Sequence, residues 1–89
     1  MTNYMIVRHK VRDFNRWKSV YDADRSKRVE AGLSEKQLLH GADDPNEVVL
    51  LFEANDLKRA KEFGSSAGLH QKMEEGGVID KPTMYFLNS

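Results

Sequence analysis

The first regular pattern in the chain is an alternation of hydrophobic and polar residues over positions 4–11. Alternation with a period of two is typical of a strand that is buried on one face. That face carries Met5, Val7, His9 and Val11. The pattern predicts a β-strand and places a histidine among the residues that should face the core.

A helical pattern follows over residues 14–31, a stretch that contains neither proline nor glycine. Asp13 precedes this stretch and is a suitable N-cap, because a carboxylate there accepts a hydrogen bond from a free backbone N–H of the first turn. Gly32 follows it and is a typical helix stop. We therefore predict one continuous helix over these residues.

Two further strands are predicted over residues 37–41 and 48–52. The first is weak, whereas the second consists of five consecutive apolar residues and is the strongest strand signal in the chain. The segment that joins them, residues 42–47, contains Asp, Asn and Pro, which favour turns. This order predicts a β-hairpin.

The second half of the chain repeats the order of the first. Asn55 or Asp56 can cap a second helix. A Gly-Ser-Ser sequence at residues 64–66 interrupts this helix, and its serines can cap a second piece over residues 67–75. A last strand is predicted over residues 83–87.

Two such strand-helix-strand halves in tandem predict an α+β, ferredoxin-like β-α-β-β-α-β fold. Its sheet should be antiparallel, and both helices should cover the same face. No low-complexity segment or linker divides the chain. We therefore expect residues 1–89 to form a single domain.

The face of the sheet away from the helices should be polar if it faces water. In the third and fourth strands, however, both alternating sets of residues are apolar, from Val48 to Phe52 and from Met84 to Leu87. Exposing such side chains costs roughly 1.5–3 kcal/mol each. We predict a homodimer in which these strands of two copies pack face to face. The alternative is a monomer with one exposed apolar face.

Composition narrows the possible functions. The chain has no cysteine, which excludes thiol nucleophiles, disulfides and cysteine-ligated zinc. Its formal net charge is zero: residues 1–30 hold eight Lys or Arg and four Asp or Glu, and residues 31–89 hold six and ten. A neutral chain is a poor nucleic-acid binder, and no apolar stretch approaches the length of a membrane span. We expect a soluble cytoplasmic protein that binds neither nucleic acid nor membrane.

Candidate chemistry lies on the first helix, where Trp17 and Tyr21 share a face that continues to Asp24 and Arg28 at spacings of three and four. One interpretation is an amphipathic helix whose polar end projects into water, with Asp24 and Arg28 paired. The other is that Trp17 and Tyr21 wall a cleft in which Arg28 holds a carboxylate or an enolate.

The histidines offer one candidate proton carrier. His9 lies on the face that we assign to the helices, so it is either a catalytic imidazole in the cleft or a core histidine with a backbone partner. His70 could face the same cleft, although a surface position is the alternative, and His40 should be exposed. The three histidines lack the spacing of metal ligands, and no cofactor motif is present. We expect neither metal nor cofactor.

Residues 7–18, 44–50, 56–63 and 76–82 resemble small bacterial proteins of the dimeric α/β-barrel superfamily. The resemblance covers nearly the whole chain and implies a ferredoxin-like fold and a dimer. That superfamily includes antibiotic-biosynthesis-type cofactor-free monooxygenases, muconolactone isomerases, polyketide cyclases and non-catalytic ligand-binding domains of regulators. The monooxygenases build their clefts from Trp, Asn, Tyr or His, to which Trp17, Tyr21 and His9 are loosely similar.

Two hypotheses follow for the function. In the first, the cleft binds a small anionic or enolisable organic molecule, with cofactor-free monooxygenase, cyclase or isomerase chemistry. In the second, the protein is a non-catalytic ligand-sensing or structural dimer module. Haem degradation, also found in the superfamily, is a third and more distant possibility.

Overall fold

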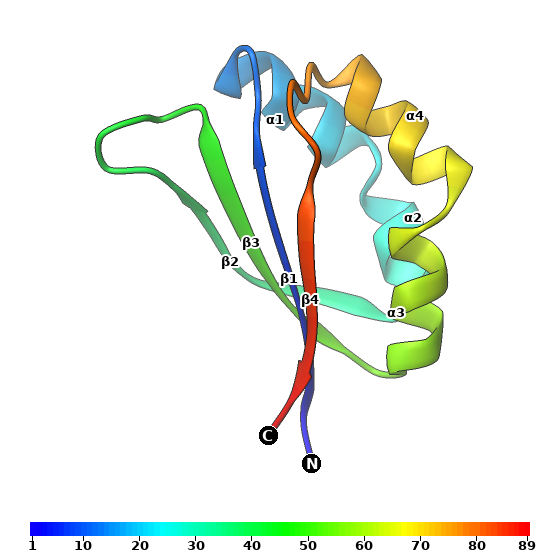
Figure 1. The fold of residues 1–89 in the computed structure, drawn as a ribbon. Helices are drawn as coiled ribbons and strands as arrows, with labels where there is room; N and C mark the ends of the chain where they lie inside the picture. Colours follow the sequence, from blue (N-terminus) through cyan, green and yellow to red (C-terminus); the bar gives the residue numbers. More distant parts are fainter.

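The computed structural model describes all of residues 1–89, which form four strands and four helices (Figure 1). In chain order the elements are β1 (Asn3–Lys10), α1 (Phe14–Ala23), α2 (Arg25–Glu30), β2 (Leu33–His40), β3 (Glu47–Ala54), α3 (Leu57–Gly64), α4 (Ala67–Glu75) and β4 (Thr83–Asn88).

The four strands form one sheet in the order β2-β3-β1-β4, and every neighbouring pair is antiparallel. All four helices lie on the same side of this sheet, as Figure 1 shows. This is the α+β, ferredoxin-like arrangement that the sequence predicted, with each of the two helices divided in two. None of the helices combines the length and the apolar composition needed to cross a membrane.

The prediction of one continuous first helix is wrong, because the helix breaks at Asp24 (φ −97°, ψ 15°). Aspartate is a poor residue for a helix interior, since its side chain competes for backbone hydrogen bonds. A side chain also compensates for the break: Arg28 Nη1 donates to the carbonyl oxygen of Tyr21 at 2.7 Å. The guanidinium thus binds the end of α1, and the predicted pair of Asp24 with Arg28 does not form.

Strand β2 is longer than predicted and starts at Leu33 instead of residue 37. Its pairing with β3 shifts register between Glu35 and Gln37, which is the signature of a β-bulge. The extra residue resets the alternation, so that both Leu33 and Leu38 lie on the helix side, opposite Ala54 and Leu50 of β3. A simple period of two does not describe such a strand.

The predicted caps and the predicted interruption of the second helix are confirmed. Asp13 Oδ1 accepts from the N–H of residue 15 at 3.1 Å, and Asp56 Oδ1 accepts from the N–H of residue 58 at 2.9 Å. Helix α3 ends at Gly64, and Ser66 caps α4 by accepting from the N–H of Leu69 at 3.2 Å. Each half of the chain therefore enters its helices through an aspartate cap.

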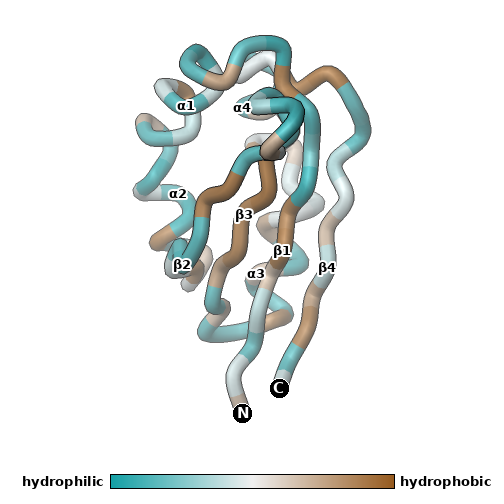
Figure 2. The backbone as a smooth tube through the Cα atoms, turned by 90° about the vertical axis from the view of Figure 1, so that its left-hand side faces the viewer, coloured by the Kyte–Doolittle hydropathy of each residue, from teal (hydrophilic) through white to brown (hydrophobic).

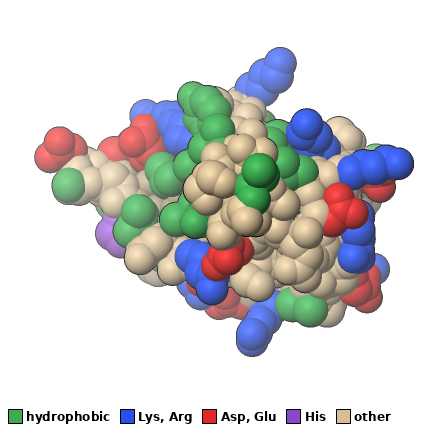
Figure 3. All heavy atoms as spheres, turned by 90° about the horizontal axis from the view of Figure 1, so that it is seen from below, with side chains coloured by type: hydrophobic (Ala, Val, Ile, Leu, Met, Phe, Trp, Pro, Cys, Tyr) green, Lys and Arg blue, Asp and Glu red, His purple; other side chains and the backbone are tan.

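The core lies between the helices and the covered face of the sheet. Hydrophobic residues run along the middle of β1 and β3 (Figure 2), and their covered side chains are buried: Met5, Val7, Val48, Leu50 and Phe52. The opposite, open face carries other hydrophobic side chains that are only partly buried or exposed. Figure 3, seen from the end with both termini, shows hydrophobic side chains gathered along the sheet with charged ones around them.

Candidate functional site

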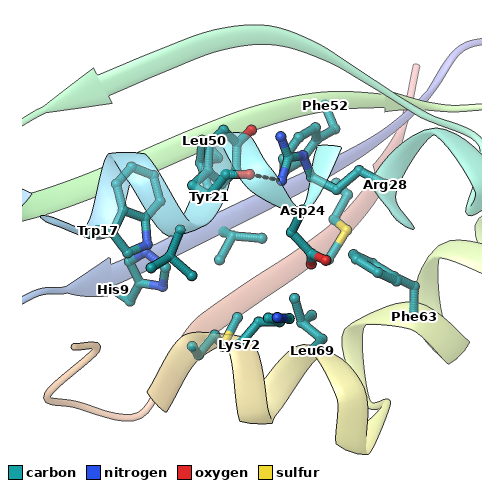
Figure 4. Close-up of a pocket in the computed structure, with 14 residues that line it drawn as sticks. His9, Trp17, Tyr21, Asp24, Arg28, Leu50, Phe52, Phe63, Leu69 and Lys72 are labelled. Carbon is teal, nitrogen blue, oxygen red and sulfur yellow. Dashed lines mark hydrogen bonds between the residues drawn. The ribbon is translucent and has the colours of Figure 1, made fainter. Parts of the chain in front are cut away.

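A cavity lies between the helices and the covered face of the sheet (Figure 4). Fourteen residues line it, ten of them hydrophobic; the polar ones are His9, Asp24, Arg28 and Lys72. The cavity measures about 60 Å³. A water molecule takes up about 30 Å³ in the liquid. The cavity in this form has room for about two waters, so an organic ligand requires its walls to move.

His9 is the most unusual residue of the cavity. It comes from the central strand β1, is 2% exposed, and lies opposite Val48 in the sheet. Neither Nδ1 nor Nε2 has a hydrogen-bond partner. Its ring meets the ring of Trp17 edge to face, with centroids 5.5 Å apart. Leaving a buried polar group unpaired costs about 1–3 kcal/mol, and such groups are often kept for binding or catalysis.

Burial also controls the protonation of His9. Desolvation lowers the pKa of His9 to about 4, because the charged imidazolium is poorly solvated there. The negative charge of Asp80 opposes this shift, and the positive charge of Arg8 adds to it. At neutral pH the imidazole is therefore uncharged, with one nitrogen able to donate a hydrogen bond and the other able to accept one.

A stack of side chains runs along the cavity from the His9 end to the opposite end. Tyr21 stacks on Trp17 with centroids 4.8 Å apart, and the guanidinium carbon of Arg28 lies 3.5 Å from the centre of the Tyr21 ring on which it stacks. The Tyr21 hydroxyl donates to Glu35 Oε1 at 2.5 Å. Burial of the hydroxyl raises the pKa of Tyr21 well above its ordinary value, and the hydrogen bond to Glu35 raises it further. The hydroxyl is thus a fixed donor to Glu35 and holds the ring under Arg28.

Arg28 brings a positive charge to this end. It is 9% exposed, and its one protein hydrogen bond is the bond to the Tyr21 carbonyl. It takes part in none of the ion pairs of the chain. A guanidinium has five N–H donors, so Arg28 keeps donors free for an anion. Figure 4 shows His9 with Trp17 at one end of the cavity and Arg28 with Phe63 at the other.

The structure brings together four of the five candidates from the sequence: His9, Trp17, Tyr21 and Arg28 all line the cavity. His70 does not, because it lies on the exposed side of α4 and contributes nothing to the cavity wall. The stripe of Trp17, Tyr21, Asp24 and Arg28 lines the cavity along its whole length, although the helix breaks at Asp24. Whether these four residues bind or transform a ligand stays a prediction.

Sequence reasoning missed the opposite wall of the cavity and one support. Phe63, Leu69, Lys72 and Met73 come from α3 and α4, and the interruption between these helices was the available signal. Glu35 of strand β2 accepts a hydrogen bond from Tyr21. The alternation of residues along β2 does not predict the side of the sheet on which Glu35 lies, because the bulge shifts the register there.

The chain contains no group of three or more His, Cys, Asp or Glu residues arranged to hold a metal ion. The polar groups that the cavity offers for chemistry are the imidazole of His9, the carboxylate of Asp24, the guanidinium of Arg28 and the ammonium group of Lys72.

No protein-family model and no curated protein matches this sequence. Solved structures do match. A Bordetella bronchiseptica protein provisionally assigned as an antibiotic biosynthesis monooxygenase superposes with a TM-score of 0.80 at 13% identity, over 99% of this chain and 96% of that one. SnoaB, a cofactor-independent oxygenase from Streptomyces nogalater, gives 0.71 at 13% identity, over 99% and 94%. Rv0793 from Mycobacterium tuberculosis gives 0.69 at 20% identity, over 100% and 95%.

These matches define the class of the fold. The chain is a ferredoxin-like α+β protein with the architecture of the antibiotic biosynthesis monooxygenase structures. This is the fold that the sequence resemblance implied. At identities of 20% or less the fold is what is shared, and the reaction has to be argued from the cavity of this chain.

Proposed function

We propose that the cavity binds a small, anionic, enolisable organic molecule and moves a proton on it without a cofactor. One observation carries this proposal: His9 is buried against the cavity with both ring nitrogens unpaired. Arg28 supports it, because this buried guanidinium has free donors and no carboxylate partner. An imidazole and a guanidinium in an apolar site are suited to form and stabilise an enolate.

The proposed step is an enolisation. One nitrogen of His9 accepts a proton from the carbon next to the carbonyl group of the ligand. The C–H electron pair forms the new carbon–carbon double bond, and the π pair of the carbonyl moves to its oxygen. The product is an enolate beside an imidazolium, and returning the proton to the same or a different position completes an exchange or an isomerisation.

The low pKa of His9, about 4, fits this step only when the ligand supplies a countercharge. An isolated imidazolium is disfavoured in the cavity because it is desolvated. An enolate formed next to it pairs with it, and attraction between charges is strong where water is excluded. The residue is thus held neutral and ready as an acceptor until the reacting molecule is in place.

Oxygenation is a second candidate, favoured by the structural likeness to a cofactor-independent oxygenase. Here dioxygen is the co-reactant. The carbon of the enolate forms a bond to dioxygen, which is reduced to a hydroperoxide as the carbon is oxidised, and the imidazolium returns its proton to the terminal oxygen. Where that carbon keeps a second hydrogen, loss of this hydrogen as a proton and cleavage of the O–O bond release water and leave a new carbonyl group. Both candidates share the enolate.

Phenylpyruvate is a suitable probe, since it is anionic, aromatic and enolisable. We expect the protein to speed exchange of its C3 protons for deuterium in D2O, measured by proton NMR. His9→Gln should slow this exchange at least 100-fold, the lower range of general-base contributions. An oxygen electrode run in parallel detects oxygenation.

His70→Gln is the matched control, because His70 lies outside the cavity, and it should leave the exchange rate unchanged. Binding of phenylpyruvate without exchange would contradict the enzymatic proposal and favour the non-catalytic, ligand-sensing alternative. Equal exchange by the wild-type protein and His9→Gln would remove His9 from the mechanism.

A further inference from the structure

We propose that helix α4 is a lid over the cavity that opens by local unfolding of the chain between Gly64 and Gly77, while the rest of the fold stays in place. The lid serves the site proposed above, and it explains how a cavity of about 60 Å³ admits an organic molecule. Three independent observations carry it: the hydrogen bonds of α4, the anchoring of the chain on either side of it, and the position of its side chains.

Helix α4 makes no hydrogen bond or ion pair to any other helix or to the sheet. The bonds at its start go to Ser66, and those at its end join Gly76, Gly77 and Val78 to the last turn of the helix. Its one ion pair, Lys72 with Glu75, is internal. Local unfolding of α4 therefore breaks only its own hydrogen bonds and no polar bond to another element.

The chain is fixed immediately before α4. Gly64, the last residue of α3, is buried so closely that a Cβ there would lie 3.0 Å from the Met84 sulfur and 3.2 Å from Phe86. Between this contact and the start of α4 lie Ser65 and Ser66, which are not part of either helix.

The chain is fixed again immediately after α4. Arg12 donates its N–H to the Gly77 carbonyl at 2.9 Å, and the N–H of residue 79 donates to the Lys10 carbonyl at 2.9 Å. Val78 pairs with Val11 as an isolated bridge beyond the end of β1. Gly77 has a φ of +80°, a left-handed conformation that glycine adopts at little cost. The nine residues of α4 thus span two fixed points through short connections.

Helix α4 is held down by the side chains that line the cavity. None of its residues is fully buried, and those that face inward, Leu69, Lys72 and Met73, are cavity-wall residues. In Figure 4 Leu69 and Lys72 lie across the cavity from His9, Tyr21 and Arg28. Opening the lid loses the contacts of these side chains with the rest of the cavity wall. A ligand that replaces those contacts offsets the free energy that opening costs, as a lid requires.

Two substitutions outside the cavity wall change the stability of α4 in opposite directions. Ser66→Ala removes the cap that accepts from Leu69 and also donates to the Phe63 carbonyl at 2.7 Å. Loss of such a cap should populate the open form roughly fivefold more. Gly68→Ala adds a methyl group with no atom within 4 Å and should populate it roughly fivefold less through helix propensity.

The test uses hydrogen exchange and Trp17, the only tryptophan of the chain, which is 3% exposed in the cavity wall. Amides of α4 should exchange at least tenfold faster than those of β1 and β3. Quenching of Trp17 fluorescence by acrylamide, a small neutral organic molecule, should rise in Ser66→Ala and fall in Gly68→Ala, in step with exchange in α4.

Exchange of α4 at the rate of the sheet would overturn the lid, because the helix would then open only with global unfolding. Changed exchange in α4 with unchanged quenching would also overturn it, because opening would not expose the cavity. Neither measurement uses a ligand, so failure of the lid leaves the enolisation proposal standing, and failure of phenylpyruvate exchange leaves the lid standing.

Discussion

His9 makes the folded protein sensitive to acid. Its pKa is about 4 in the folded chain and near 6.5 in an unfolded one. Between these values the unfolded chain binds a proton that the folded chain does not, so the free energy of unfolding falls as pH falls from about 6.5 to about 4. The pKa difference corresponds to about 3 kcal/mol in total.

We therefore predict that His9→Leu abolishes this loss of stability. Urea unfolding at a series of pH values between 4 and 7 measures it, and the variant should also be more stable at pH 7, because it removes two unpaired buried nitrogens. His40→Leu is the control, since His40 is exposed, and it should keep the wild-type slope. Loss of stability that is the same in wild type and His9→Leu would contradict the assignment. Asp44 and Asp80 also have lowered pKa values. Their protonation lowers the free energy of unfolding further, but only at pH values near and below the ordinary pKa of an aspartate.

Arg28 does several things that a lysine cannot do together. Its planar group stacks on Tyr21, donates to the Tyr21 carbonyl and keeps further donors for a ligand. We predict that Arg28→Lys raises the phenylpyruvate concentration for half-saturation about tenfold, as measured by titration followed by NMR. Arg25→Lys is the matched control, because Arg25 is exposed on the same short helix. An equal effect of both substitutions would indicate a general charge effect in place of a specific contact.

At the scale of elements, the sequence predicted the order of strands and helices and the second helix break, because caps, glycines and apolar runs are local signals. It did not predict the break at Asp24, which depends on Arg28 folding back onto Tyr21. It also missed the first half of β2, because the bulge after Glu35 breaks the alternation. Both failures come from contacts or pairing that no short window of sequence contains.

The same reasoning accounts for the cavity. The stripe of Trp17, Tyr21 and Arg28 and the inward face of His9 follow from helix and strand periodicity. The contribution of α3 and α4 does not, because it depends on how the two broken helices cross the sheet. Glu35, which supports Tyr21, could be found only in three dimensions.

Caps should contribute measurably to stability. Asp56→Ala removes the bond from the N–H of residue 58 at the start of α3 and should lower the free energy of unfolding by about 1 kcal/mol. Asp56→Asn keeps a side-chain acceptor for this hydrogen bond and should therefore retain most of the free energy of unfolding that Asp56→Ala loses. Asp43→Ala in the exposed hairpin turn is the control, with no comparable loss. Thermal and urea unfolding provide the measurement, and equal stabilities of Asp56→Ala and Asp43→Ala would contradict the assigned cap.

At the scale of the whole molecule, three ion pairs join the basic first third of the chain to its acidic remainder. Arg8 pairs with Glu47 at 2.7 Å and with Asp80 at 2.9 Å, and Lys10 pairs with Asp44 at 3.3 Å. These contacts pair two basic side chains of the first part with three acidic side chains of the second. They leave the middle of the open sheet face without an unpaired charge.

That middle is apolar. Ile6 of β1 lies between Leu51 of β3 and Tyr85 of β4, and Tyr85 and Leu87 are 53% and 44% exposed. An exposed hydrophobic patch of this kind marks an interaction surface. The occupant that we propose is a second copy, because the charges at the margin of this face are already paired and none of them opposes self-association.

We predict a particle of about twice the chain mass of 10.2 kDa by light scattering at micromolar concentration. Ile6→Glu should convert it to a monomer, because it buries a charge at the centre of the face. Val29→Glu is the control: Val29 is 60% exposed on α2, on the side of the helices, and its substitution should leave the mass unchanged. A wild-type monomer at this concentration would contradict the dimer.

The bulge in β2 affects how easily the edge of one sheet can pair with the edge of another. An edge strand with a regular, unpaired row of N–H and C=O groups is a template for other strands, and a sheet can then grow sideways into a fibre. The irregularity after Glu35 interrupts that row on one edge, and β4 on the other edge is only six residues long. Copies that meet edge to edge therefore find poor registry, which disfavours growth of the sheet at its edges even though one of its faces is apolar.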